Sequence, residues 1–238
     1  MSDRRIRQQF GKAVREFALI EDGDAILIGL SGGKDSLLLT ELLARQSKIF
    51  KPRFTVEAAH VRMENVEYES DLSALRQFCD VLGVRLHILT TAIPQPTADH
   101  PAPQPCFRCS WQRRKMLFGL AQELHCNKIA LGHHMDDIIH TALLNLFHEG
   151  RFGTMPVRLK LGKMPLTIIR PLCMMSEADI QAYAEERNYP RQRKRCPYEQ
   201  ESQREEMKQL FQHIEKQNPE VRHSIWHALT RDGKLVEP

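Results

Sequence analysis

The sequence lacks any apolar run approaching the ~18 residues that a helix needs to cross a bilayer. We therefore expect neither an integral membrane protein nor a membrane partner. The chain begins with a basic, amphipathic stretch that has no continuous apolar segment, so we expect neither a signal peptide nor a transit peptide. Its 6 cysteines are too few for a disulfide scaffold in 238 residues. Reduced thiols or metal ligands and a cytoplasmic location are expected instead.

Internal repeats, low-complexity tracts and a strong charge imbalance are also missing. The 34 Lys and Arg residues against 30 Asp and Glu give a net charge of +4, too small to indicate an anionic partner by itself. A composition of 42% hydrophobic and 27% charged residues is that of an ordinary globular protein. The length fits one large domain, or one domain with an appendage.

What is present is an alternation of strand and helix patterns. Buried strands are predicted at 24–30, 54–63, 85–92, 128–132 and 166–172, the last of these being the final strand. Helices are predicted at 6–17, 37–44, 72–82, 109–124, 136–147, 177–187 and 198–230. The five prolines within 93–105 exclude a helix or central strand there, and 149–165 is expected to be a loop. The alternation predicts an α/β fold with a doubly wound, mostly parallel sheet, which binds ligands at the carboxyl ends of its strands.

The first strand leads directly into the segment Ser31-Gly32-Gly33-Lys34-Asp35-Ser36 and an apolar helix. Two glycines let the backbone approach a phosphate closely, and the helix directs its N–H groups and positive dipole end to the same place. Lys34 adds a cation, and Ser31 and Ser36 add hydroxyl groups. The segment is neither a Walker A loop nor a G-x-G-x-x-G fingerprint. A ligand-free turn is the alternative for an isolated Gly-Gly, but the flanking strand and helix favour phosphate binding.

A second polar segment follows the strand at 128–132, and it contains His133, His134, Asp136 and Asp137. Carboxylates at the carboxyl edge of a sheet can hold Mg²⁺ against a triphosphate. Taken alone, such a helix start is more often a cap with surface polarity.

Three cysteines carry a third signal. Cys106 and Cys109 form a C-x-x-C motif, and Cys196 lies in a basic stretch. Such a pair can bind one metal centre, form a redox disulfide or have no special role. Three thiolates suit a [4Fe–4S] cluster with one iron left open. A zinc site completed by His100 or His125 is the alternative. The remaining cysteines are expected to be core thiols: Cys79, Cys126 and Cys173.

SGGKDS resembles the SGGxDS signature of the PP-loop in the N-type ATP pyrophosphatase superfamily. LGHHMDDIIHTALLN resembles its second signature, GHxxDDxxET, with His140 where glutamate is common. Together with PCxxC opening a basic helix, NLFHEGRFGTMP, RPL and the third cysteine, these segments are similar to the TtcA family. Its members are tRNA 2-thiocytidine synthetases that modify cytidine 32 of the anticodon loop. The resemblance spans roughly residues 10–200 and most of the chain.

The resemblance implies a PP-loop, adenine nucleotide alpha hydrolase-like fold. An N-terminal helix would occupy 1–22, the catalytic domain 23–175 and a helical region 176–238. It also implies that ATP adenylates the base and that a cysteine desulfurase supplies the sulfur, with a homodimer compatible with the sequence. The implied catalytic residues are Lys34, Asp35, Asp136 and Asp137. The implied ATP contacts are Ser31, Gly32, Gly33, Lys34, Asp35, Ser36, His60, Gly132, His133 and Asp137. The implied [4Fe–4S] ligands are Cys106, Cys109 and Cys196.

Basic residues gather in three clusters beside the predicted site loops. They are Arg113, Arg114 and Lys115; Arg151 and Arg158 with the lysines of 149–165; and Arg191, Arg193, Lys194 and Arg195. Any one cluster alone could be a solvated face. Their common position predicts binding of the tRNA phosphate backbone. No RRM, KH or zinc-knuckle motif is found, so recognition by shape and charge is expected.

Two other functions stay open. Another PP-loop reaction, the synthesis of lysidine or 2-thiouridine in tRNA, would use the same phosphate loop, and lysidine synthesis needs no metal cluster. A nucleotide- or RNA-binding module without catalysis is the alternative from a different class, although the intact SGGKDS segment and the Asp136–Asp137 pair argue against it.

Overall fold

The computed structural model of the protein describes residues 2–65, 71–93, 105–190 and 203–237. Within these ranges, seven strands form one sheet in the order β3-β2-β1-β4-β6-β5-β7. The strands are β1 (Ala25–Gly29), β2 (Thr55–Met63), β3 (Arg85–Thr91), β4 (Lys128–Ala130), β5 (Arg158–Lys160), β6 (Thr167–Ile169) and β7 (Val236–Glu237). The neighbours from β3 to β6 are parallel, β5 pairs antiparallel with β6, and β7 pairs parallel with β5, so β5 and β7 run opposite to the other five strands. The predicted doubly wound, mostly parallel sheet is confirmed.

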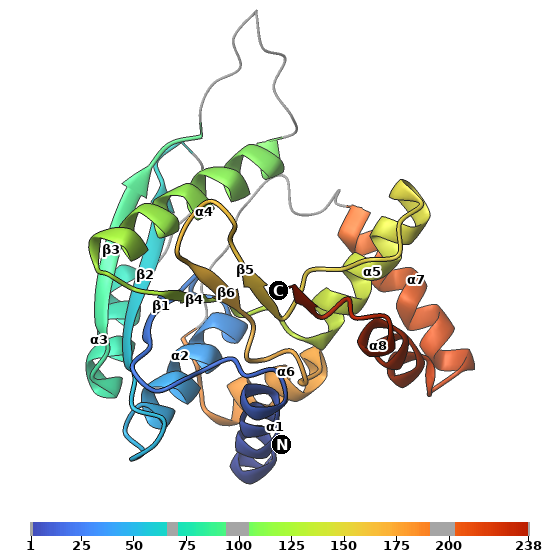
Figure 1. Ribbon diagram of the computed structural model, residues 1–238, viewed down its shortest axis with the longest axis horizontal. Coiled ribbons are helices and arrows are strands. Elements are labelled where there is room, and N and C mark those ends of the chain that lie inside the picture. Colours follow the sequence, from blue (N-terminus) through green and yellow to red (C-terminus); the bar gives the residue numbers. More distant parts are fainter. Residues whose placement is uncertain (1, 66–70, 94–104, 191–202, 238) are drawn as a thin grey trace, which may run out of the picture.

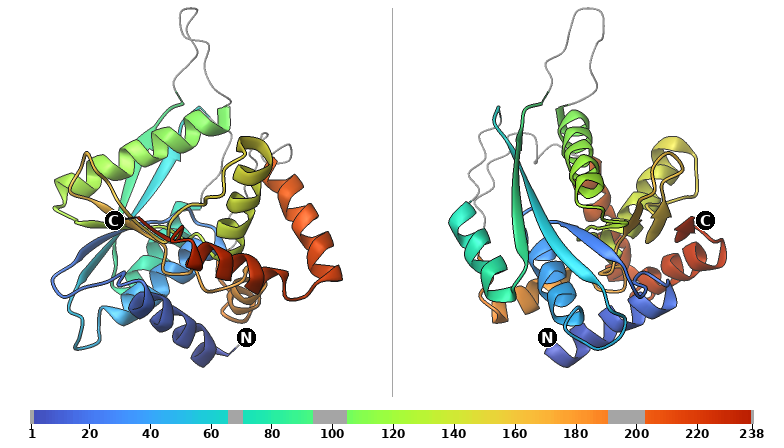
Figure 2. Two further views of the ribbon diagram at one scale, coloured as in Figure 1. Left: turned by 45° about the vertical axis from the view of Figure 1, so that its right-hand side comes forward. Right: turned by 60° about the vertical axis from the view of Figure 1, so that its left-hand side comes forward.

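Helices cover both faces of this sheet (Figures 1 and 2). They are α1 (Asp3–Glu16), α2 (Lys34–Gln46), α3 (Leu72–Leu82), α4 (Pro105–Glu123), α5 (Met135–Glu149), α6 (Glu177–Glu186), α7 (Gln203–Gln217) and α8 (Val221–Arg231). Figure 2 shows α3 and α4 on opposite faces of β2 and β3. The described part of the chain contains no helix long and apolar enough to span a membrane.

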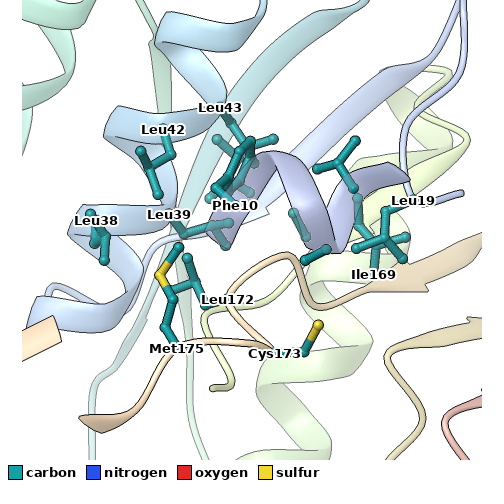
Figure 3. Close-up of a cluster of buried hydrophobic side chains, with 14 of the residues drawn as sticks. Phe10, Leu19, Leu38, Leu39, Leu42, Leu43, Ile169, Leu172, Cys173 and Met175 are labelled. Carbon is teal, nitrogen blue, oxygen red and sulfur yellow. The ribbon is translucent and has the colours of Figure 1, made fainter. Parts of the chain in front are cut away.

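The alternation of side chains along β1 explains the two layers of the core. Ile26 and Ile28 pack in the cluster that includes α1, α2 and α6, whereas Leu27 packs in the cluster under α4. Figure 3 shows part of the first cluster, in which Phe10 of α1 and Leu39 of α2 are buried. Strand β1 is therefore apolar on both faces, as expected for a strand covered on both sides.

The three predicted core thiols are confirmed. Cys79, Cys126 and Cys173 are all buried, and Cys173 is among the side chains of the cluster in Figure 3. Burial raises the pKa of the Cys79 thiol to about 11, so it stays protonated and unreactive at neutral pH.

Four predictions of secondary structure need correction. Residues 158–160, expected in a loop, form β5, and β7 follows the strand that was expected to be last. Helix α4 begins at Pro105 and not at Cys109, because the first helical position needs no N–H donor and therefore accepts proline. The polar helix predicted at 198–230 is two helices, α7 and α8, with a break at 218–220. The three-residue strands β4 and β6 are found from sequence because each lies in an apolar run, whereas β5 and β7 lie outside such runs.

A buried ion pair joins the amino ends of β1 and β4. The Lys128 side chain is 6% exposed, and its Nζ lies 2.7 Å from Oδ2 of Asp24 and donates to the Leu19 carbonyl at 3.1 Å. The Asp24 carboxylate also accepts hydrogen bonds from the Glu21 backbone N–H and the Asn127 amide. This network fixes β1 beside β4 at the end of the strands away from the predicted phosphate loop.

We expect Lys128→Met to lower the free energy of unfolding by about 3–5 kcal/mol, because it leaves the buried Asp24 carboxylate without its cation. Urea denaturation followed by circular dichroism measures this loss. The double variant Asp24→Asn/Lys128→Met removes both charges and should recover a large part of it. An equal loss in both variants would show that packing, and not the unpaired charge, causes the effect.

Candidate active site

The site lies between β1 and β4, where the order in which the chain adds strands to the sheet reverses. Strand order continues from β1 to β2 and β3 on one side and from β4 to β6 on the other, so the chain leaves β1 and β4 in opposite directions. A crevice forms outside the carboxyl ends of two such strands. The loop at 30–33 follows β1 and the loop at 131–134 follows β4, so both predicted signatures meet at this point.

The phosphate loop is organised by its two serines. Gly32 has φ of 84°, a left-handed conformation that favours glycine. Ser36 Oγ accepts from the Gly32 N–H at 3.2 Å and lies 2.9 Å from the Gly33 carbonyl oxygen. The Gly33 N–H is directed to Ser31 Oγ at 3.3 Å. Gly33 is the N-cap of α2 and has no side chain to cap the helix, so the first N–H groups of α2 face the crevice.

Gly132 supports this loop from the neighbouring strand. A Cβ atom added at Gly132 would lie 3.0 Å from the Ser36 backbone nitrogen and 3.1 Å from the Asp35 carbonyl carbon. A side chain of any size at this position would displace backbone and not merely another side chain. The predicted involvement of Gly132 therefore has a structural reason: it lets the loop after β4 touch the start of α2.

His134 lies among three carboxylates from α2 and α5. Its Nε2 is 3.4 Å from Oδ2 of Asp137 and 3.9 Å from Oδ1 of Asp35, and its Nδ1 is 3.6 Å from Oδ2 of Asp136. The His134 backbone N–H also donates to Asp137 at 3.0 Å, which caps α5. The capping interpretation of this segment is confirmed, and its role in holding Mg²⁺ stays a prediction. No group of three His, Cys, Asp or Glu side chains in the described ranges is arranged to hold a metal ion.

Both carboxylate oxygens of Asp136 accept hydrogen bonds from residues that are distant in the sequence. Its Oδ2 accepts from the Glu177 backbone N–H at 2.8 Å, and its Oδ1 accepts from Arg222 Nη1 at 2.6 Å. Burial alone would raise the pKa of Asp136, but the hydrogen bonds from Arg222 and Glu177 hold it below its usual value. Asp136 is therefore ionised and positions α6 and α8. Asp35 and Asp137, with side chains 28% and 32% exposed, are the carboxylates that a ligand can reach.

Lys34, the predicted phosphate cation, is shared between two carboxylates. Its Nζ lies 3.2 Å from Oδ1 of Asp35 and 3.5 Å from Oε1 of Glu177 at the start of α6. Lys208 of α7 binds the other oxygen of Glu177 at 2.9 Å. Burial raises the pKa of Glu177, but the Lys208 hydrogen bond and the nearby Lys34 charge lower it overall. Glu177 thus stays ionised between two cations, one of which belongs to the phosphate loop.

Two histidines predicted to contact ATP are held by neighbouring groups. Arg170 Nε donates to His133 Nδ1 at 3.1 Å, which leaves the proton of the neutral ring on Nε2. Burial lowers the pKa of Arg170 to about 10, still well above neutral. His60 is completely buried, and its Nδ1 lies 2.8 Å from the carbonyl oxygen of Leu30, where the phosphate loop begins. This geometry favours support of the loop by His60, and its contact with ATP stays a prediction.

Two of the three predicted cluster ligands are described. Cys106 and Cys109 lie in the first turns of α4, three residues apart and hence on neighbouring positions of the helix surface. Cys106 is exposed and Cys109 is half-buried. Cys196 lies outside the described residues, as do His100 and four predicted RNA-binding residues: Arg191, Arg193, Lys194 and Arg195. His125 follows the far end of α4, roughly 25 Å from Cys109 at the rise of an α-helix, so it is excluded as a fourth zinc ligand.

The other predicted RNA-binding residues border the site. Arg114 and Lys115 are exposed on α4, and Arg113 is half-buried there. Arg151 follows α5 and pairs at its surface with Glu149 at 3.6 Å, and Arg158 lies in β5. In all views of Figures 1 and 2, the start of α4 and the end of α5 lie on the same side of the molecule. That these two basic clusters form one surface with the cluster at 191–195 stays a prediction.

Sequence patterns miss four residues that shape this site: Arg170, Glu177, Lys208 and Arg222. Arg222 and Lys208 lie more than 60 residues beyond the signatures, so no local signal connects them with the phosphate loop. His134 had a signal, since it lies two residues before the predicted helix start, but the resemblance assigned ATP contact to His133.

Comparisons with known proteins agree with this geometry. The family model described as PP-loop domain matches residues 2–214. A tRNA-cytidine(32) 2-sulfurtransferase of Saccharophagus degradans is 34% identical over 96% of this chain and 74% of its own length. Another from Pelobacter propionicus is 36% identical over 95% of this chain and 85% of its own length. Among solved structures, the U34-tRNA thiolase NcsA from Methanococcus maripaludis with its [4Fe-4S] cluster has a TM-score of 0.77 at 26% identity, covering 95% of this chain and 78% of that one.

We expect Gly132→Ala to destabilise the protein by about 1–3 kcal/mol and to weaken ATP binding, because the new methyl group would push the start of α2 away from β4. Urea denaturation and calorimetric titration with ATP measure the two effects. Gly162→Ala is the matched control, since a Cβ there meets no atom within 4 Å. Normal ATP affinity in Gly132→Ala would contradict the importance of this close approach.

We expect substitutions at Glu177 and Lys208 to change ATP affinity in opposite directions. Glu177→Gln releases Lys34 for the phosphates and should tighten binding, whereas Lys208→Met leaves Glu177 to Lys34 alone and should weaken it. Each shift should be about two- to fivefold, as for partly exposed ion pairs. Calorimetric titration measures both, with Lys12→Met as a control at the exposed Lys12–Glu16 pair. Shifts of the same sign would rule out competition for Lys34.

Proposed function

This chain belongs to the PP-loop domain family, together with the curated tRNA-cytidine(32) 2-sulfurtransferases, and from that premise we propose that it converts cytidine 32 of tRNA to 2-thiocytidine. ATP-dependent thiolation of tRNA is the activity that its relatives and its fold support. The observation that carries the proposal is the meeting of the phosphate loop, Asp35 and Asp137 at the carboxyl ends of β1 and β4.

In the first step, the C2 carbonyl oxygen of cytidine attacks the α-phosphorus of ATP, and the bond to pyrophosphate breaks. The N–H groups at the start of α2 bind the phosphates, and Lys34 moves from Glu177 to balance the charge that develops on pyrophosphate. Mg²⁺ fits Asp35 and Asp137, because this ion takes one or two carboxylates and several phosphate and water oxygens. A preformed cage of protein ligands is therefore not needed.

In the second step, a hydrosulfide-level sulfur attacks C2, and AMP leaves with the former base oxygen. Adenylation is required because oxide is a very poor leaving group, whereas AMP is a good one. The electron pair of the C2–O bond departs with AMP, so the exchange of oxygen for sulfur needs no change in oxidation state. Exclusion of water from the adenylated base is needed at this stage, because hydrolysis would return cytidine.

The thiols of Cys106 and Cys109 fit a [4Fe–4S] cluster, with Cys196 as the third ligand. A cluster held by three thiolates has one iron without a protein ligand, which suits it to bind the transferred sulfur. NcsA, the structural neighbour named above, carries a [4Fe–4S] cluster. A cysteine desulfurase would supply the sulfur as a persulfide through a transient encounter, and a pair of thiols would reduce it to the hydrosulfide level and become a disulfide in return.

One alternative substrate has a specific observation in its favour. The neighbouring structure NcsA is a U34-tRNA thiolase, so uridine 34 is the competing base. Mass spectrometry of tRNA after reaction distinguishes the two positions. Thiolation at uridine 34 with unmodified cytidine 32 would overturn the proposed substrate and leave the thiolase activity in place.

We expect Lys34→Ala and Asp35→Ala to abolish AMP formation while the fold is retained, because both side chains act on phosphate charge and contribute little packing. The measurement is release of AMP and pyrophosphate in the presence of unmodified tRNA, with circular dichroism to verify folding. Lys12→Ala, on the exposed surface of α1, is the control. Normal turnover in either phosphate-loop variant would refute the assignment of the loop.

We expect Cys106→Ala and Cys109→Ala each to lose the iron–sulfur absorbance and thiolation, whereas Cys79→Ala and Cys126→Ala retain both. The measurement is a visible spectrum with iron and sulfide analysis of protein purified without oxygen. Loss of iron in one of the two buried-thiol variants would mean that the ligand set is wrong. A colourless protein that still modifies tRNA would favour lysidine synthesis instead.

A further inference from the structure

The start of α4 presents two large aromatic side chains to solvent. Phe107 is 55% exposed and Trp111 is 49% exposed. Four residues apart, they lie on the same side of the helix, roughly 6 Å apart along its axis. Lys115 continues this row, with its Nζ 5.5 Å from the centre of the Trp111 ring. Large aromatic side chains that are exposed next to each other are typical of an interaction surface.

The orientation of this row is fixed by the rest of the helix. Leu117, Leu120 and Ala121 of α4 are buried against the sheet. Gln112 Nε2 also donates to Thr91 Oγ1 of β3 at 2.8 Å, which holds the first half of the helix in place. Phe107 and Trp111 therefore stand outward on a rigid element and need no large rearrangement to meet a partner.

The charge beside the aromatic row indicates the partner. From 105 to 122, α4 has no acidic residue, whereas Arg108, Arg114 and Lys115 lie next to the aromatic positions. Flat apolar rings with cations at their edges match unpaired nucleobases joined by phosphates.

We propose that Phe107 and Trp111 form a stacking platform for unpaired bases of the tRNA anticodon loop, with Arg114 and Lys115 binding the adjacent phosphates. The inference rests on the proposed function, because it takes tRNA as the substrate. Cys106 directly precedes Phe107, so the platform adjoins a proposed cluster ligand. Stacking of the neighbouring bases there holds the loop open and presents the target base to the crevice.

The affinity test compares Trp111→Ala and Phe107→Ala with the wild-type protein in filter binding of an unmodified tRNA transcript. Stacking contributes about 1–3 kcal/mol per base, so each variant should bind about fivefold or more weakly. The salt dependence of binding should stay unchanged, because no phosphate contact is lost. Lys115→Met should instead flatten that dependence by about 0.7 log units of affinity per decade of salt. Trp111→Tyr should bind nearly as well as the wild type.

Phe50 provides the matched control. It is 72% exposed and has the Arg53 guanidinium 5.0 Å from its ring centre, but it lies between α2 and β2, away from the phosphate loop. Phe50→Ala should bind tRNA normally. If Phe50→Ala lost as much affinity as Trp111→Ala, the loss would not depend on the position of the aromatic side chain, and the platform would be rejected.

Fluorescence gives a direct readout of stacking. The chain has 2 tryptophans, and Trp226 packs against Phe17 with ring centres 6.4 Å apart. In Trp226→Phe, Trp111 is the single emitter, and tRNA should quench it at the concentrations that saturate filter binding. In Trp111→Phe, the emission of Trp226 should not respond.

The outcomes separate this inference from the proposed function. A wild-type protein that neither binds nor modifies tRNA would overturn both. Normal binding and thiolation in Trp111→Ala and Phe107→Ala, with unquenched Trp111, would overturn the platform alone. If these variants bind tRNA normally but no longer accept sulfur from a cysteine desulfurase, the surface is a protein-docking site and the RNA proposal is wrong.

Discussion

The contact between Gly132 and the start of α2 is the constraint on which the site depends. Because β1 and β4 are parallel neighbours whose chains leave in opposite directions, the loops after them must meet outside the sheet. They meet so closely that a Cβ at Gly132 would be 3.0 Å from a backbone nitrogen of α2. This contact sets the distance between the start of α2, with its N–H groups and Asp35, and the Asp137 carboxylate at the start of α5. The sheet topology therefore determines where the two loops of the site meet, whichever side chains they carry.

The charges around this crevice connect it with the end of the chain. Asp136 binds Arg222 of α8, and Lys34 is connected to Lys208 of α7 through Glu177. Each of these ion pairs is partly or largely shielded from water, so removal of one partner costs more than it would in an exposed pair. The helices at the carboxyl end are thus tied to the phosphate loop by charge as well as by the apolar contact of α7 with α5. Movement of Lys34 away from Glu177 would leave Glu177 at the start of α6 paired with Lys208 of α7 alone.

The sequence predicts the parts of this protein that local patterns encode. The parallel strands and the positions of the two polar segments after β1 and β4 all depend on short runs of residues, and the structure confirms these positions. Strands β5 and β7 are missed because, unlike the equally short β4 and β6, they do not lie in apolar runs. Arg222 and Lys208 escape it because an ion pair between residues 86 or 31 positions apart leaves no trace in either segment. The cluster ligand at Cys196 lies beyond what the structure describes, so the ligand set is still the one that resemblance implies.

Helix α4 carries the residues of two proposed functions, cluster binding and base stacking, on one rigid element. Its first turns carry Cys106 and Cys109, and the same turns hold Phe107 and Trp111 in solvent. Because its second half is buried against β1, β2 and β4, the helix does not rotate to serve one task at a time. The positions of Cys106 and Cys109 and of the two aromatic rings are therefore fixed relative to each other and to the phosphate loop. An RNA loop bound to this helix could be adenylated and then receive sulfur without moving to a second site. This would limit the time for which the adenylated base is exposed to water.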